Sequence, residues 1–328
     1  MDSILNRLSQ RQELPETAVV YVGRRENGER VDYLTVQEAV DAIPAENDTP
    51  VILYVLPGVY REAVRVSGCK PHIYLVGLGE KPEDVIITYD NYAGRKRENG
   101  DMTGTFRSAT VSVYANHFTA ENITFRNSFD GDDNVGGRQA LAFYASGEHI
   151  VCRNCRFLGK QDTLYTRDGS QLYENCYIEG DVDFIFGGAR AVFDRCTIRS
   201  LARCFKDPAS VQGYVCAPST YLAQKYGYVF RECTLESDCL PDTVYLGRPW
   251  HAGSDANAVG CAYFVRCKLG EHIKEVGWTD MGGFLGRNAR FAEYKCEGPG
   301  AKAHPSRPVL SDEEAERLTN ETVLGWNE

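Results

Sequence analysis

The chain has 328 residues, with 43% hydrophobic and 25% charged residues and a formal net charge of -10 at pH 7. No apolar run approaches the roughly 20 residues that cross a bilayer, so this globular composition predicts no membrane association. Nucleic acid is not expected as a partner, because the basic residues are dispersed, and any polyanionic partner would be repelled unless a local cleft reversed the field.

Residues 1–30 are predicted to be an N-terminal extension. Met1–Pro15 carries several charged residues and lacks the apolar stretch of about 7–15 residues that a secretory signal requires. We therefore favour a cytoplasmic location, and expect a secreted protein only if a signal has been removed.

Residues 31–50 are predicted to form an N-terminal cap that contains a short amphipathic helix. Its apolar positions recur at helical spacing and stop before Pro44: Val36, Ala39, Val40 and Ile43. Such a helix would protect the open edge of a structure built from stacked strands.

Five cysteines share one local context, with an apolar residue two positions after each of them: Cys155, Cys176, Cys196, Cys233 and Cys267. The segment around Ile123 has the same shape, with isoleucine in place of cysteine. The copies at positions 155, 176 and 196 are 21 and 20 residues apart, and alternating apolar residues are typical of strands. Short strands that recur once per coil predict an all-β solenoid, in which these side chains stack as a core ladder.

Cys152 and Cys155 also form a CxxC pair, which could be half of a zinc site or a redox pair. No second CxxC or CxxH completes four ligands, and the repeat already assigns Cys155 to the core. We therefore expect no metal and no cofactor.

The spacing is larger toward the C-terminus, with 37 residues from Cys196 to Cys233 and 34 from Cys233 to Cys267. These intervals predict loops between coils, which would wall a cleft. Asp130–Gly137 is a loop too short for a linker, so we treat residues 1–328 as a single domain. In residues 305–328, Ser311 and Glu314 form a capping box for a second capping helix that extends to about Leu318.

Two neighbouring repeats align over Asn154–Asp162 and Asn175–Asp183, so that Asp162 and Asp183 each follow the aligned cysteine by seven residues. Adjacent coils are about 4.8 Å apart, so the two carboxylates would be stacked and only one could ionise easily. This arrangement indicates a nucleophile and a general acid. A solvated charge ladder is the alternative, and the apolar residues that follow each aspartate argue against it.

Five segments, in order between about Val31 and Trp326, resemble the pectin methylesterase family: Gly58-Val59-Tyr60-Arg61-Glu62, Gln139-Ala140-Leu141-Ala142, Gln161-Asp162-Thr163-Leu164-Tyr165, Asp183-Phe184-Ile185-Phe186-Gly187 and Leu246-Gly247-Arg248-Pro249-Trp250. The resemblance implies a right-handed parallel β-helix. It also implies a carboxylic ester hydrolase that removes C6 methyl groups from pectin, in pectin degradation and cell-wall modification.

The resemblance also implies the role of each site residue. Asp183 would attack the C6 carbonyl, and Asp162 would act as general acid and then as general base. Gln139 and Gln161 would donate hydrogen bonds to the oxyanion, and Arg248 would hold Asp183 ionised, with a surface salt bridge as the alternative for Arg248. Because strand alternation cannot send both Gln161 and Asp162 into one cleft, we expect a bulge or turn there.

The family pattern further implies substrate contacts by four aromatic residues and two others: Tyr144, Tyr165, Phe186, Trp250, Thr105 and Val182. Aromatic faces suit sugar C–H surfaces, although core packing explains Tyr144 and Tyr165 equally well. The expected partners are pectin or methylated oligogalacturonides, and the expected state is a monomer. The negative net charge predicts a preference for highly esterified substrate, unless a basic lining cancels the repulsion locally.

Two other functions are kept as alternatives. The first is a β-helix polygalacturonase or pectate lyase, although the sequence contains neither the carboxylate constellation of the hydrolase nor the calcium site with a basic catalytic residue that lyases usually need. The second is an inactive polysaccharide-binding homologue, which retention of both aspartates, both glutamines and the arginine disfavours.

Overall fold

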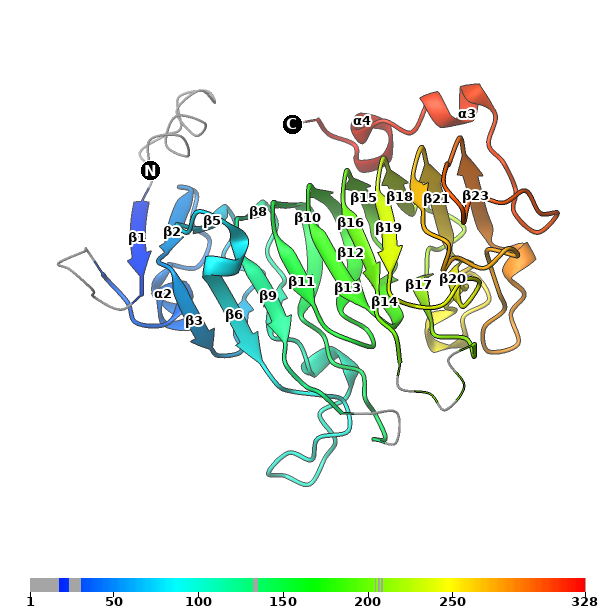
Figure 1. Ribbon diagram of the computed structural model, residues 1–328. Coiled ribbons are helices and arrows are strands. Elements are labelled where there is room, and N and C mark those ends of the chain that lie inside the picture. Colours follow the sequence, from blue (N-terminus) through cyan, green and yellow to red (C-terminus); the bar gives the residue numbers. More distant parts are fainter. Residues whose placement is uncertain are drawn as a thin grey trace.

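The computed structural model in Figure 1 describes residues 18–23, 31–131, 135–203, 205, 207 and 209–327. In it the chain winds into a right-handed parallel β-helix, whose neighbouring coils pair strand on strand in parallel. Of the predicted extension, residues 1–17 and 24–30 lie outside the described residues. Residues 18–22 form a strand instead, which is the first in the stack.

Each complete coil contributes to three sheets. The first sheet contains β1 (Ala18–Val22), β2 (Val51–Val55), β5 (Ile73–Gly77), β8 (Phe118–Glu121), β10 (Phe143–Arg153), β12 (Leu164–Glu174), β15 (Arg190–Asp194), β18 (Tyr228–Arg231), β21 (Cys261–Val265) and β23 (Arg290–Tyr294). The second sheet contains β3 (Gly58–Arg61), β6 (Val85–Tyr89), β9 (Thr124–Asn127), β11 (Arg156–Leu158), β13 (Tyr177–Gly180), β16 (Thr197–Ser200), β19 (Thr234–Ser237) and β22 (Lys268–Leu269). The third sheet contains β4 (Val64–Val66), β7 (Val111–Val113), the N-terminal parts of β10 and β12, β14 (Val182–Gly187), β17 (Gly213–Pro218) and β20 (Val244–Gly247).

The core lies inside the solenoid, and the predicted cysteine ladder is part of it. The five repeat cysteines are between 0% and 2% exposed, and Ile123 is fully buried beside them. The residue before each of them has a positive φ, such as 48° at Asn154 and 52° at Asn175, which turns the chain from the first sheet into the second. Asparagine tolerates this left-handed conformation better than most residues, which explains its place in the repeat.

The cysteine thiols donate hydrogen bonds to backbone carbonyl oxygens, and they also fill space in the core. The Cys176 thiol donates to the carbonyl oxygen of Cys152 at 3.3 Å, and the same type of bond recurs one coil later from Cys196 to Tyr173. Within the described residues, no group of three or more His, Cys, Asp or Glu side chains is placed to hold a metal ion. The CxxC pair, Cys152 and Cys155, is buried in the core, as the repeat predicted for Cys155.

The length of the connection from the second sheet to the third sheet varies along the solenoid. It is short in two consecutive coils, at residues 159–163 between β11 and β12 and at residue 181 between β13 and β14. It is long in the coils on both sides, at residues 90–110, 128–142 and 201–212. Figure 1 shows these connections along one edge of the solenoid, with the cyan 90–110 connection projecting farthest. The short corners are therefore flanked by longer connections, and the long one after Cys196 is where the cysteine spacing predicted an inserted loop.

Short helices lie near both ends. Helix α2 (Val36–Ala42) forms at the predicted place, with Thr35 and Glu38 in a capping box. Helix α3 (Asp312–Glu316) begins after the predicted cap at Ser311, and α4 (Asn320–Leu324) follows it. The C-terminal segment then runs back along the first sheet, where the Trp326 ring stacks on His149 at 4.9 Å. Four single 3-10 turns complete the described elements: η1 (Pro82–Asp84), η2 (Thr105–Arg107), η3 (Ala252–Ser254) and η4 (Gly286–Asn288). No helix among the described residues is long and apolar enough to cross a membrane.

Candidate active site

The two aspartates occupy equivalent corners of adjacent coils. Asp162 lies in the short connection before β12, and Asp183 is the second residue of β14. Their φ angles are 65° and 50°, so both are in the left-handed region, and the Asp162 amide donates to the carbonyl oxygen of Val182 at 3.0 Å. The pairing of β14 with β17 also shifts register at Asp183. The turn or bulge expected at Gln161 and Asp162 is therefore present, and Asp183 has the same left-handed conformation.

Glycines keep these corners tight. Gly159 and Gly180 recur at aligned positions, and each packs against the residue four positions later. A Cβ added at Gly180 would lie 2.2 Å from the Cβ of Phe184, which is far too close for two carbon atoms that are not bonded to each other. A larger residue would push the two aspartate corners apart.

Arg248 is the residue directly after β20, and β20 lies two strands from β14 in the third sheet. Its Nε and Nη2 donate to the two carboxylate oxygens of Asp183 at 2.8 and 2.7 Å. The guanidinium carbon lies 3.7 Å from the ring centroid of Tyr214, so the cation also stacks on an aromatic face. This two-point contact fixes the orientation of the Asp183 carboxylate as well as its charge, and Arg248 is half-buried rather than a surface partner.

Burial and charge distinguish the two carboxyl groups. Burial raises the pKa of Asp162 well above its usual value, and the neighbouring charge of Asp183 raises it further. Burial also raises the pKa of Asp183, but the Arg248 hydrogen bond and charge oppose that rise directly. Asp183 is therefore the carboxyl group that ionises first, and Asp162 is the one that retains its proton.

Both carboxyl groups are nearly buried, in keeping with the apolar residues that follow each aspartate in the sequence. Asp162 is 8% exposed and Asp183 is 6% exposed. Electrostatic interactions in such a buried site are stronger than they would be at an open surface.

Gln139 and Gln161 are brought together by backbone pairing. The amide of Ala140, next to Gln139, donates to the carbonyl oxygen of Gln161 at 3.1 Å. The carbonyl oxygen of Gln139 in turn accepts from the Ala93 amide at 2.8 Å, so the 90–110 connection holds this segment in place. Neither side-chain amide makes a hydrogen bond to another residue in the described ranges, so both are available to a ligand.

The predicted aromatic residues form one cluster beside the aspartates. The Tyr165 ring lies 4.5 Å from Phe186 and 5.0 Å from Tyr144, and Phe186 lies 5.5 Å from Trp250. Tyr144, Tyr165 and Phe186 are nearly buried, whereas Trp250 is half-buried. The first three therefore act largely as packing, and Trp250 has the most ring surface to offer a ligand.

The remaining two predicted contacts are Val182 and Thr105. Val182 is buried and directly precedes Asp183 in β14. Thr105 is half-buried in η2, and its carbonyl oxygen accepts from the Ser108 hydroxyl at 2.6 Å. These positions are next to the site, but neither side chain is shown to point into it.

Sequence reasoning missed Phe106 in η2. Its ring is 46% exposed and stacks on Tyr165 at 4.9 Å, which extends the aromatic cluster toward solvent. No periodic pattern includes this residue, because it lies in the longest loop. Its exposure beside a buried aromatic is the signal that identifies it.

A third buried carboxylate was also missed. Asp181 lies two residues before Asp183 and is 3% exposed, and Arg138 pairs with it at 2.6 Å. This ion pair ties the loop that carries Gln139 to the corner that carries Asp183. A buried Asp beside the Asp162 and Asp183 pair could have been suspected from the Gly-Asp-Val-Asp sequence, but its partner, 43 residues away, could not.

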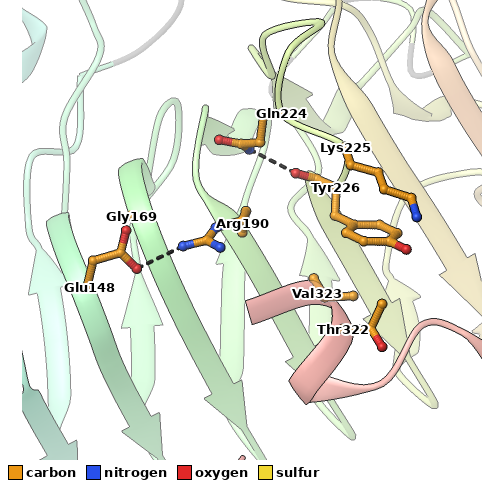
Figure 2. Close-up of a pocket in the computed structure, with 8 residues that line it drawn as sticks. All are labelled: Glu148, Gly169, Arg190, Gln224, Lys225, Tyr226, Thr322 and Val323. Carbon is orange, nitrogen blue, oxygen red and sulfur yellow. Dashed lines mark hydrogen bonds and ion pairs between the residues drawn. The ribbon is translucent and has the colours of Figure 1, made fainter. Parts of the chain in front are cut away.

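A separate hollow of about 490 Å³ lies over the first sheet, beneath α4 (Figure 2). Two charged residues that line it, Arg190 and Glu148, form an ion pair at 2.9 Å. The Gln224 amide donates to the carbonyl oxygen of Tyr226 at 2.8 Å within the same loop. None of the predicted site residues lines this hollow, so the aspartate corners are the candidate active site.

Comparison with known proteins gives one consistent result. The family model described as Pectinesterase matches residues 20–324. The chain is 36% identical to Pectinesterase 31 of Arabidopsis thaliana, with 86% of each chain covered, and 32% identical to Pectinesterase A of Dickeya dadantii, with 89% of this chain and 87% of the relative covered. Among solved structures, pectin methylesterase PemA from Erwinia chrysanthemi superposes with a TM-score of 0.87 at 32% identity, over 94% of this chain and 97% of that chain. A pectin methylesterase in complex with a hexasaccharide gives the same TM-score and coverage at 30% identity.

Proposed function

The chain belongs to the pectinesterase family, and from this premise we propose that it acts as a pectin methylesterase through Asp183 as the nucleophile and Asp162 as the general acid and base. Its activity is that of a carboxylic ester hydrolase, which converts methyl-esterified galacturonan and water into de-esterified pectin and methanol. The observation that carries the residue assignment is the asymmetric carboxyl pair, in which only Asp183 is held by an arginine fork.

In the first half of the reaction, a carboxylate oxygen of Asp183 attacks the C6 carbonyl carbon of a methyl-galacturonate unit. The carbonyl π electrons move to oxygen, and the resulting tetrahedral intermediate collapses as the bond from C6 to the methoxy oxygen breaks. Asp162, which retains its proton because burial raises its pKa, donates that proton to the departing methoxy group. Methanol leaves, and Asp183 is joined to the sugar as an acyl-enzyme anhydride.

In the second half, Asp162 is ionised and accepts a proton from a water molecule. The hydroxide so formed attacks the same C6 carbon, and the bond from C6 to the Asp183 oxygen breaks. The products are a galacturonic acid unit and the free Asp183 carboxylate, which the Arg248 fork receives without reorganisation. Asp162 regains its proton, so the enzyme returns to its starting state.

The free amides of Gln139 and Gln161 are assigned to the oxygen that becomes negative in both intermediates. The backbone pairing described above supports this assignment, because it joins the segment of Gln139 to Gln161, the residue directly before Asp162. A well-placed donor of this kind contributes about 3 kcal/mol to the transition state. Trp250 and Phe106, whose rings both lie close to that of Tyr165, are assigned to the faces of the sugars that flank the scissile ester.

One experiment separates this function from the alternatives. Methanol release from highly esterified pectin is measured beside the formation of new reducing ends and of unsaturated ends. We expect methanol without either kind of end, and we expect the Asp183→Asn variant to release none. Reducing ends would support a polygalacturonase, unsaturated ends a lyase, and no product of any kind an inactive binding protein.

A further inference from the structure

A second, strongly basic pocket of about 610 Å³ lies in the 90–110 connection. Four of its lining side chains are cations and one is an anion: Arg95, Lys96, Arg97, Arg107 and Glu98. This local excess of positive charge contrasts with the net charge of -10 on the whole chain. None of these residues belongs to the candidate active site.

The pocket is built on an ordered hairpin rather than on a loose loop. The Gly104 amide donates to the Ala93 carbonyl at 2.9 Å, the Thr103 amide donates to the Arg95 carbonyl at 2.8 Å, and the Arg97 amide donates to the Asp101 carbonyl at 2.8 Å. These bonds form a ladder between the two arms of the hairpin 93–104. The cations are therefore presented on a fixed backbone, which lowers the entropy cost of binding a ligand.

Three of the four cations have no carboxylate partner among the described residues: Lys96, Arg97 and Arg107. Arg95 differs, because its Nη1 pairs with Asp90 at 3.3 Å. Arg107 donates through Nε to the carbonyl oxygen of Thr103 at 2.7 Å, which orients its guanidinium without neutralising it. The carboxylates of Glu98 and Asp101 lie on the same hairpin and reduce the field, but the cations outnumber them.

The hairpin lies near the candidate active site. It leaves the second sheet after β6, on the same edge as the aspartate corners and two coils before the corner of Asp162, which corresponds to about 10 Å along the axis. Phe106, two residues after the hairpin, stacks on Tyr165 of the aromatic cluster. Ala93, at its base, is bonded to Gln139.

We propose that this basic pocket binds free galacturonate carboxylates of the same pectin chain whose methyl ester lies at Asp183. The proposal rests on the proposed function and specifies its substrate further. A methyl ester is neutral and is not attracted to cations, whereas each unit that has already been de-esterified carries one negative charge. The pocket would therefore favour a chain with a de-esterified stretch on one side of the scissile ester, contrary to the preference that the net charge alone predicts.

The first test is a double variant, Lys96→Ala with Arg97→Ala, because both residues are exposed and neither has a carboxylate partner among the described residues. Binding of unesterified trigalacturonate is measured by calorimetry at low ionic strength, and the variant should bind about fivefold more weakly for the loss of two surface ion contacts. The difference should disappear near 1 M salt, where the Debye length falls to about 3 Å. Unchanged affinity in the variant would overturn the proposal.

The second test compares kcat/KM for methanol release from two substrates, a fully methylated oligogalacturonide and a half-esterified one. The variant should lose about fivefold on the half-esterified substrate and change little on the fully methylated one. The matched control is Lys225→Ala with Arg317→Ala, which removes the same charge from exposed residues on the first-sheet side. An equal loss of kcat/KM in the control would mean that the net charge of the protein, and not the basic pocket, determines activity on the half-esterified substrate.

These measurements distinguish the two proposals from each other. If the wild-type protein releases no methanol from the fully methylated substrate, the proposed function fails. Calorimetry with trigalacturonate then still decides whether the basic pocket binds uronate. If methanol is released and both double variants match the wild type, the further inference alone is wrong.

Discussion

Replacement of Arg248 by lysine tests the geometry of the site more sharply than removal of its charge. The wild-type guanidinium makes two parallel hydrogen bonds to Asp183 and lies flat on Tyr214 at 3.7 Å. Lysine keeps the positive charge, but it can direct only one hydrogen bond along this axis and loses the planar stack. The Arg248→Lys variant is therefore expected to fold but to hold Asp183 poorly.

The expected decrease in activity follows from the hydrogen bond that is lost. A hydrogen bond between charged groups contributes about 1.5–3 kcal/mol, which corresponds to a decrease in kcat/KM of about 10- to 100-fold. The pH profile should change as well. Arg248 opposes the rise that burial causes in the pKa of Asp183, so a weaker contact raises that pKa. Because the nucleophile must be ionised, activity is lost as pH falls through this pKa, and the acid limb should move to higher pH.

The assay is methanol release from esterified pectin as a function of pH, with thermal unfolding measured in parallel. The control is Arg61→Lys, which makes the same substitution at an exposed arginine paired with Asp90. A kcat/KM within threefold of the wild type, together with an unmoved acid limb, would show that the bidentate contact does not position Asp183 for catalysis.

Three further predictions concern other parts of the chain. Asp162→Asn and Asp183→Asn should each lower the rate of methanol release about a thousandfold or more while thermal unfolding remains cooperative, since asparagine keeps the shape and tolerates the positive φ; near-wild-type turnover in either would refute the assignment. Burial lowers the pKa of His272 to about 4, against about 6.5 when unfolded, so the native state binds fewer protons between these values. The free energy of unfolding should thus fall by up to about 3 kcal/mol as pH drops from about 6.5 to 4, and urea titrations should show a smaller fall in His272→Gln. Burial raises the pKa of the Cys176 thiol, so this thiol should remain unlabelled by a thiol reagent until the protein is denatured, whereas the exposed Cys69 should react at once. Peptide mapping that finds Cys176 labelled in the native protein would contradict its place in the core.

The parts of the fold that repeat could be predicted from the sequence. Cys155 and Cys176 recur at the coil period because each must fill the same volume one strand further along, so their spacing carries structural information. The same register places Asp162 and Asp183 at equivalent corners. The need for a turn at Gln161 was also predictable, because strand alternation allows only one of two adjacent side chains on a face.

The parts that do not repeat could not be predicted. Phe106 and the hairpin 93–104 lie in a connection whose path depends on its own hydrogen bonds, and no other coil within the described ranges contains a copy of it. The Arg138 pair with Asp181 joins two coils through side chains, which no strand period describes.

The contrast between short aspartate corners and long flanking connections also bears on how this chain could change over evolutionary time. Lengthening a flexible connection costs little, because the entropy of closing it grows only with the logarithm of its length, by about 0.6 kcal/mol for each doubling. The connections at 90–110 and 201–212 could therefore be exchanged for longer or shorter ones without moving the strands that carry the aspartates. A corner of one residue, such as Asp181, has no such freedom, since any insertion there would displace Asp183 itself. Selection can thus reshape which stretch of polymer this chain accepts while the chemistry stays fixed.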